Sequence, residues 1–235
     1  MLMKQTNRIW ELDALRGFCI LCVVVLHFLY DLQAILGWEI LDNPVIYYVM
    51  QYGGILFVAL SGLCATLGRR SFRRGVLVFA CGMVSTLVTW AMAALGLVHE
   101  SIVIKFGVLH LLGVCMMVWP ALRRLPVWAW AVLGAVLVGL GWWFRTFTVS
   151  VPWLFPLGLT APGFTSSDYF PLLPGLGWFL VGAVLGKFLY KEKRSLLPNF
   201  PAENFVVKFF RWCGTRSLWI YLIHQPVLYF LVSLF

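Results

Sequence analysis

The sequence has too few charged residues for a soluble domain of its size. Aspartate and glutamate together number only nine, and all charged residues make up 11% of the 235 residues. Hydrophobic residues make up 62%, and the mean hydropathy is +0.90. Such a composition is typical of chains that face lipid instead of water. We therefore expect an all-α, polytopic membrane helix bundle in a lipid bilayer, organised as one domain over residues 1–235.

The sequence has few cysteines and no visible internal repeat. These features argue against a cysteine-based redox or metal site and against a repeat-built transporter. Of the six cysteines, five fall within apolar runs. Cys19 and Cys22 have the C-x-x-C spacing of redox and metal sites, but no second pair of ligands accompanies them. We interpret the cysteines as small hydrophobic residues. No internal repeat is visible, which argues against an inverted-repeat transporter. The first apolar run lacks a small-residue cleavage pattern, so we expect it in the mature protein.

Long apolar runs between charge clusters predict seven transmembrane helices. A helix needs about 20 apolar residues to cross the hydrocarbon core of a bilayer. The predicted spans are residues 14–36, 46–68, 75–97, 102–120, 126–144, 173–190 and 215–235. Residues 145–172 are rich in proline, glycine and aromatic residues. That composition predicts an external loop instead of a regular spanning helix.

Basic residues alternate between the predicted connecting segments, which gives an orientation. Lysines and arginines favour cytoplasmic loops. One set of segments holds Lys4, Arg8, the run 69–74, Arg123, Arg124, the run 187–194, Lys208 and Arg211. The alternate set holds Glu39, Asp42, His99, Glu100 and Asp168, with Arg145 as its only basic residue. We therefore predict a cytoplasmic N-terminus and an extracytoplasmic C-terminus. The net charge of +9 follows from this topology, so no nucleic acid partner is needed to explain it.

His27 is the polar residue of the first span that most strongly indicates chemistry. It lies near the middle of an apolar run, with Asp31 one helical turn later. An ionisable pair inside a membrane helix is costly and is therefore a candidate functional site. Residues at i and i+4 share one side of a helix, so Asp31 is placed to orient the imidazole and raise its basicity. We predict His27 and Asp31 as catalytic residues.

Two more histidines, His110 and His224, fall near mid-membrane on other predicted helices. Histidines from three helices at similar depth could line one cavity, although each could also be an interhelical hydrogen-bonding residue. We expect no metal site, because no two of the histidines have the i, i+4 spacing of helical ligands. Lys105 lies a few residues inside the predicted fourth helix, where it would reach the interface or pair with Asp31 or Asp168.

Five sequence blocks, in order, resemble the bacterial branch of the heparan-α-glucosaminide N-acetyltransferase catalytic-domain family. The blocks are LDALRGFCILCVVVLHFLYDL, GGILFVALSGLCATLGRR, FGVLHLLG, DYFPLLPGLGWFLVGAVLGK and RSLWIYLIHQPVL. The first two are also similar to the acyltransferase-3 family, which has Leu-Arg-Gly and a membrane histidine in its first helix. On that pattern, the functional arginine and histidine correspond to Arg16 and His27.

The resemblance implies a multi-pass O- or N-acyltransferase of the bacterial cytoplasmic membrane. Such an enzyme would take an acyl group, expected to be acetyl, from cytoplasmic acyl-CoA and deliver it to a glycan or small sugar on the other side. Heparan is not the acceptor we expect. His27 would act as general base or carry the acyl group itself. The predicted phosphate-binding residues are Arg16, Arg69 and Arg70, and the predicted acceptor contacts are Lys105, His110, Asp168, Tyr169 and His224.

Two other classes of protein fit the intramembrane polar residues. A transporter or proton-coupled carrier would use the histidines and Asp31 as a relay. A scaffold in an envelope complex would use them only as hydrogen bonds between helices. Binding of coenzyme A would separate the enzyme from the carrier. Asp168 and Tyr169 have a structural alternative too, as a turn cap and an interfacial aromatic anchor. The sequence leaves the oligomeric state open, with a homo-oligomer as one option.

Overall fold

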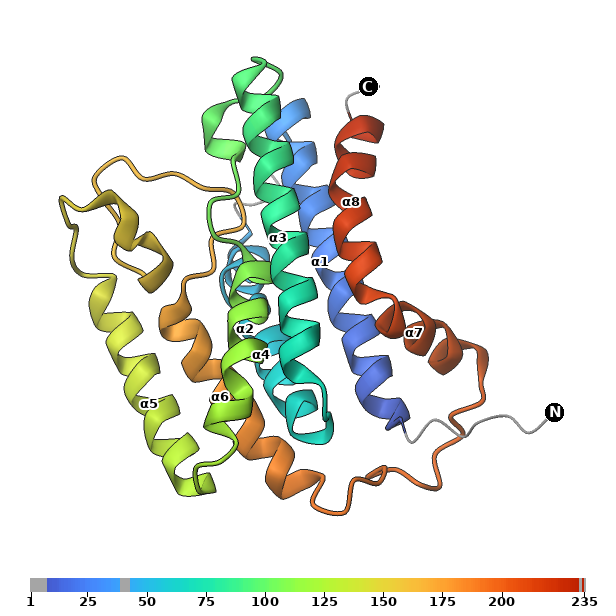
Figure 1. The fold of residues 1–235 in the computed structure, drawn as a ribbon. Coiled ribbons are helices and arrows are strands. Elements are labelled where there is room, and N and C mark those ends of the chain that lie inside the picture. The colour runs from blue at the N-terminus through green and yellow to red at the C-terminus, as the bar shows by residue number, and fades with distance from the viewer. Residues whose placement is uncertain (1–7, 39–42, 233, 235) are drawn as a thin grey trace. The chain divides into compact units, whose positions relative to one another are not determined.

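The computed structural model describes residues 8–38, 43–232 and 234. Lys4, Glu39 and Asp42 of the topology argument lie outside the described residues, as do residues 233 and 235 of the predicted last span. The order of elements is α1 (Trp10–Leu36), α2 (Pro44–Leu67), α3 (Ser71–Ala94), η1 (Glu100–Ile102), α4 (Val108–Leu122), α5 (Val127–Phe144), η2 (Pro152–Leu157), α6 (Leu172–Leu189), α7 (Phe205–Thr215) and α8 (Ser217–Val232). The described residues contain no β-strand, which confirms the all-α prediction (Figure 1).

Five of the helices are long and apolar enough to cross a membrane. They are α1, α2, α3, α5 and α6. The apolar helices α4 and α8 also match predicted spans but are shorter, at 15 and 16 residues. At the usual rise per residue each is about 22 to 24 Å long. Five helices are therefore candidate membrane spans by length and composition, whereas the count of seven and the orientation stay predictions.

The structure corrects the sequence interpretation at two places. The fourth helix begins at Val108 instead of residue 102, because Gly107 is extended and residues 100–102 form a separate 3₁₀ turn. A short helix, α7, occupies part of the segment that the sequence predicts as a cytoplasmic loop. Its start is marked by Asn204, whose side chain accepts a hydrogen bond from the Val207 amide at 2.8 Å. The signal that could have found it is the helical spacing of its aromatic residues.

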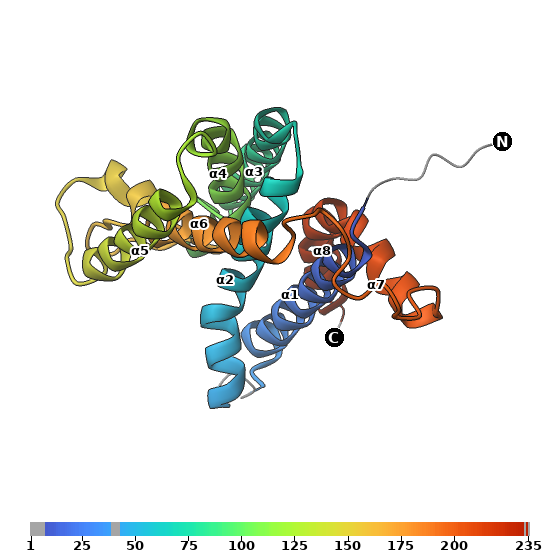
Figure 2. The same cartoon turned by 90° about the horizontal axis from the view of Figure 1, so that it is seen from below.

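The chain divides into two compact units. The first contains Met1–Phe57 and Leu189–Phe235. In this unit α1 packs against α7 and α8, and both views show the three helices side by side (Figures 1 and 2). A Cβ atom on Gly17 would collide with the Phe210 carbonyl of α7, and one on Gly214 would collide with the Asp13 carbonyl of α1. The two glycines therefore permit a backbone-to-backbone crossing of α1 and α7.

The segment before α7 is fastened to the start of α1. Both Glu11 carboxylate oxygens accept hydrogen bonds there, from the Leu196 amide at 2.7 Å and the Ser195 hydroxyl at 2.9 Å. Trp10 stacks on Phe200 with ring centroids 5.2 Å apart. These contacts hold α7 at one end of α1, far along the helix from Asp31.

The second unit contains Val58–Phe188. Its helices α3 and α4 run antiparallel, since Gly82 lies against His110 while Gly75 lies against Met117. Gly62 and Gly182 bring α2 and α6 together in the same way. Small residues at these crossings let the helices approach closely, as in other membrane bundles. The predicted external loop contains only the 3₁₀ turn η2 and an isolated bridge between Thr148 and Thr160 among its described residues.

Candidate active site

His27 and His224 face each other between α1 and α8 in the first unit. Their ring centroids are 5.0 Å apart with an interplanar angle of 59°. His224 is buried, with 8% exposure, and His27 is partly buried. The ring of His27 forms no hydrogen bond with any residue that the structure describes. Its nitrogens are therefore available to a substrate.

Asp31 is bonded to Gln225, not to His27. The Gln225 Nε2 group donates to both carboxylate oxygens, at 3.1 Å and 3.2 Å. Asp31 is 4% exposed, and no cationic side chain forms a salt bridge with it in the described part of the chain. A carboxylate only accepts hydrogen bonds, so this pairing fixes which end of the Gln225 amide faces α1. Asp31 thereby positions the α8 segment that carries His224.

The hydrogen bond of His224 defines its tautomer. Nδ1 lies 2.6 Å from the Tyr221 carbonyl oxygen one turn earlier in α8. Because a carbonyl oxygen can only accept, Nδ1 carries the proton in the neutral ring and Nε2 keeps a lone pair. The first unit thus holds one imidazole with a defined tautomer beside a second that is free of protein hydrogen bonds among the described residues. Such a pair can accept, hold and return a proton away from water.

Sequence reasoning missed Gln225. Its Oε1 atom is buried and accepts no hydrogen bond from the residues that the structure describes. The available signal was an amide side chain next to His224 inside an apolar segment. Amide side chains are rare within membrane helices, so Gln225 is a candidate functional residue together with the neighbouring His224.

His110 lies in the second unit, and both of its ring nitrogens already have protein partners. The Gly107 amide donates to Nδ1 at 3.1 Å. Nε2 lies 3.3 Å from the Thr86 hydroxyl, whose own proton goes to the Ile104 carbonyl at 2.7 Å. Nε2 therefore carries the proton. This network ties the start of α4 to α3, and an acceptor substrate at His110 would have to replace one of its bonds.

Asp168 connects the predicted external loop, residues 145–172, to α4, and Tyr169 forms a hydrogen bond within that loop. The Asp168 carboxylate accepts a hydrogen bond from the Val108 amide at 3.1 Å, which caps the first turn of α4 from a distant part of the chain. The Tyr169 hydroxyl donates to the Phe155 carbonyl at 2.6 Å, and burial raises the pKa of Tyr169 to about 12. Lys105 is exposed and precedes α4, contrary to its predicted place inside a helix. Its ammonium lies 4.9 Å from the Phe164 ring centroid.

Replacing Asp168 with alanine is expected to lower the free energy of unfolding by about 0.5 to 2 kcal/mol, because the α4 amide loses its cap. Thermal unfolding of the detergent-solubilised protein measures the change. Asp168→Asn, which retains an oxygen acceptor, should recover most of the stability. A loss of acceptor affinity with unchanged stability would instead show that Asp168 contacts the substrate.

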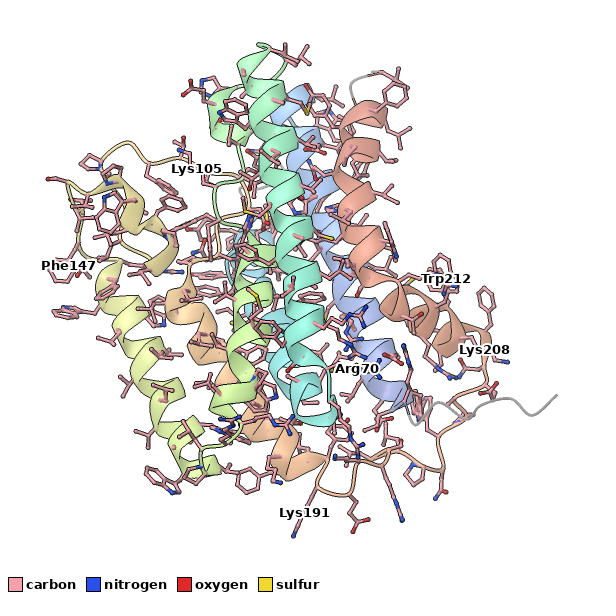
Figure 3. All side chains as sticks on the ribbon, viewed as in Figure 1. Arg70, Lys105, Phe147, Lys191, Lys208 and Trp212 are labelled. Carbon is pink, nitrogen blue, oxygen red and sulfur yellow. The ribbon has the colours of Figure 1, made fainter. Side chains whose placement is uncertain are left out.

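The predicted phosphate-binding arginines have different surroundings. Arg16 in the first unit pairs with Asp13 at 3.3 Å, and Arg8 lies 3.9 Å from the same carboxylate. Arg69 and Arg70 in the second unit are exposed and form no ion pair within the described residues. Figure 3 shows Arg70 and Lys105 toward opposite ends of the second unit. Arg69 and Arg70 are thus available to an anionic ligand.

Comparison with known protein families identifies the family of this chain. Among the described residues no group of three or more His, Cys, Asp or Glu side chains could hold a metal ion. Neither the curated proteins nor the solved structures gave a match to this chain. The family model described as "Heparan-alpha-glucosaminide N-acetyltransferase, catalytic" matches residues 8–226. The chain therefore belongs to the heparan-α-glucosaminide N-acetyltransferase catalytic-domain family, a family of membrane transferases.

Proposed function

We propose that this protein transfers an acyl group, expected to be acetyl, from cytoplasmic acyl-CoA to a hydroxyl or amine of a sugar on the opposite side of the membrane. The observation that carries the proposal is the contact between His27 and His224, with the Asp31–Gln225 pair beside it on the same two helices. Family membership supports the transfer reaction, and His27 and His224 would supply the proton chemistry that it needs. The expected location is the bacterial cytoplasmic membrane.

The donor proposal is supported by a one-sided charge distribution in the second unit. The acidic residues of this unit are Glu100 and Asp168, on the loops near the start of α4. The opposite end of the α3–α4 pair carries six exposed arginines, which are Arg69, Arg70, Arg73, Arg74, Arg123 and Arg124. The preference of lysine and arginine for cytoplasmic loops explains why this end is positively charged. It does not explain why all six residues are arginine and none is lysine. Arginine is the better bidentate partner for phosphate, which coenzyme A supplies in its diphosphate and 3′-phosphate groups.

Two routes of acyl transfer are chemically balanced, and each uses the His27 imidazole. As general base, His27 removes the proton from the acceptor while the acceptor oxygen or nitrogen attacks the thioester carbon. The C–S bond then breaks, and the coenzyme A thiolate takes the proton from His27. As acyl carrier, the unprotonated His27 nitrogen attacks the thioester carbon, the C–S bond breaks, and the coenzyme A thiolate leaves with the proton of the other ring nitrogen. The acceptor then attacks the acyl-imidazole, the C–N bond to His27 breaks, and the acceptor's proton returns to the imidazole. In both routes His224, held by the Tyr221 carbonyl, limits the rotation of the His27 ring through their contact.

The first test is thermal stabilisation of the purified protein by acetyl-CoA and longer acyl-CoAs, with thioester loss followed in parallel. Stabilisation by an acyl-CoA, with thioester loss that requires His27, is the expected result. A stoichiometric burst of coenzyme A release without acceptor would select the acyl-carrier route. If no acyl-CoA stabilises the protein, the enzyme proposal is wrong and the His27–His224 pair would fit the proton relay of a carrier instead.

Replacing Arg69 and Arg70 together with glutamine is expected to raise the KM for acyl-CoA about tenfold with little change in kcat. The variant removes exposed charge-assisted hydrogen bonds to phosphate and leaves the histidine pair intact. Steady-state kinetics measures both parameters. Arg145→Gln is the matched control, because Arg145 is a basic residue of the external loop that stacks on Trp142 at 4.9 Å. Equal effects of the two changes would contradict a donor site at Arg69 and Arg70.

A further inference from the structure

Helix α7 has three distinct faces. The first is buried against α1, where Phe210 and Gly214 meet Gly17 and Asp13 and Cys213 is 2% exposed. The second is apolar and exposed. The third is basic. The first face packs against another helix of this unit, whereas the other two are exposed, so their surroundings decide where α7 lies.

The exposed apolar face consists of large side chains at helical spacing. The exposed fractions are 83% for Phe205, 59% for Val206, 44% for Phe209 and 52% for Trp212. These four residues fall within one arc of about 120° at 100° per residue. Figure 3 shows Trp212 on the side of α7 away from α1. A face of this size exposed to water is unfavourable, which indicates a nonpolar environment.

The basic face borders the apolar face. Lys208 and Arg211 lie on this edge, and Arg216 follows with its guanidinium 4.7 Å from the Trp212 ring centroid. Lys208 and Arg211 share a single carboxylate, Glu203, at 3.1 Å and 3.4 Å. The hydrogen bond and charge of Lys208 lower the pKa of that carboxyl, with a smaller contribution from Arg211. The pairs are exposed, so the lysine and arginine exchange readily between Glu203 and another anion.

The length of α7 excludes a transmembrane path. Its 11 residues extend about 16 Å, roughly half the thickness of the hydrocarbon core. A helix with an apolar face, a basic edge and this length has the properties of helices that lie in the membrane plane. The preceding loop continues the same surface, since Leu196, Leu197 and Phe200 are 46% to 49% exposed and follow the exposed Lys191, Lys193 and Arg194.

We propose that α7 lies in the plane of the membrane interface, with its apolar face among the acyl chains and Lys208 and Arg211 at the phosphates of anionic lipid headgroups. The partner is an anionic bilayer surface, which attracts basic residues near it. This placement is independent of the acyl-transfer proposal. It supports the ends of α1 and α8, the two helices that carry His27 and His224.

The test uses the intact protein in nanodiscs and tryptophan quenching by lipids brominated on their acyl chains. The contribution of Trp212 is the difference between the wild type and Trp212→Phe. We expect brominated phosphatidylcholine to quench Trp212, and brominated phosphatidylglycerol, in a mixed bilayer, to quench it severalfold more. No quenching of Trp212 by either lipid would place α7 outside the bilayer, in water or against a soluble partner, and would overturn the proposal.

Charge variants test the headgroup contact separately. In the Lys208→Gln/Arg211→Gln variant the excess quenching by phosphatidylglycerol should disappear, while quenching by phosphatidylcholine persists. In Glu203→Gln the excess should increase, because the competing carboxylate is gone. Arg123→Gln/Arg124→Gln is the matched control, with the same loss of charge on the α4–α5 turn, and should keep the excess at Trp212. If the control loses the excess quenching by phosphatidylglycerol equally, or if the α7 variant keeps that excess, the headgroup contact is overturned.

Discussion

Replacing His27 with alanine is expected to reduce the rate of acyl transfer by about 10² to 10⁴-fold, the usual contribution of a general base. Binding of acyl-CoA should remain, because the arginines proposed for the phosphates lie elsewhere in the chain. The two quantities are measured on the same preparation, as the rate of thioester loss with acceptor and as thermal stabilisation by acyl-CoA. This combination separates lost chemistry from lost binding.

His99→Ala is the control for the His27 substitution. His99 is exposed and only caps the 3₁₀ turn η1, where its Nδ1 accepts a hydrogen bond from the Ser101 amide at 3.3 Å, so the rate should not change. A His27→Ala protein that retains full activity would remove His27 from the mechanism. A variant that unfolds at low temperature without acyl-CoA would show a packing role, as expected for a scaffold.

Replacing Gly17 with alanine is expected to lower the free energy of unfolding by about 1 to 3 kcal/mol or more. The added methyl group would meet the Phe210 carbonyl and the Gly214 amide, which are backbone atoms of α7 and cannot rotate away. Either the α1–α7 crossing must widen or α7 must leave α1. Thermal unfolding in detergent measures the cost.

Gly53→Ala is the matched control, since it also adds one methyl group to a membrane helix. A Cβ atom there would have only ordinary contact with Val49 Cγ1, at 3.7 Å. We expect Gly53→Ala to be neutral or slightly stabilising, because alanine is the better helix former. Equal destabilisation by the two substitutions would contradict the close crossing at Gly17.

The sequence predicted what depends on local composition and missed what depends on helix rotation. Six of the seven predicted spans match a helix to within four residues at each end, whereas the fourth helix begins six residues after its predicted start. The proline-rich segment 145–172 is irregular, as its composition predicts. His27 and His224 were expected at similar depth, but depth alone could not show that their rings touch. The partner of Asp31 depends on how α8 is turned toward α1, so Gln225 could not be chosen over His27.

The missed helix α7 and the roles of His110 and Asp168 have a related explanation. Helix α7 is short, and its basic residues look like a loop when spans are identified by hydropathy. The bonds of His110 come from Gly107 on its own segment and Thr86 on α3. Those contacts exist only after α3 and α4 pack. Asp168 reaches Val108 across 60 positions of sequence, a separation that no local pattern encodes.

The contacts of residues 145–172 with the start of α4 limit how easily this loop can move within the second unit. The loop gives α4 its first acceptor through Asp168, and Ser166 accepts a hydrogen bond from the Lys105 amide at 3.0 Å. The Phe170 amide donates to the Phe106 carbonyl at 2.9 Å. Moving this loop aside would break all three hydrogen bonds, each of which has a backbone amide as donor and is worth about 1 kcal/mol. Residues 145–172 are therefore held in place at three points, and under the proposed function an acceptor would have to bind without displacing this segment.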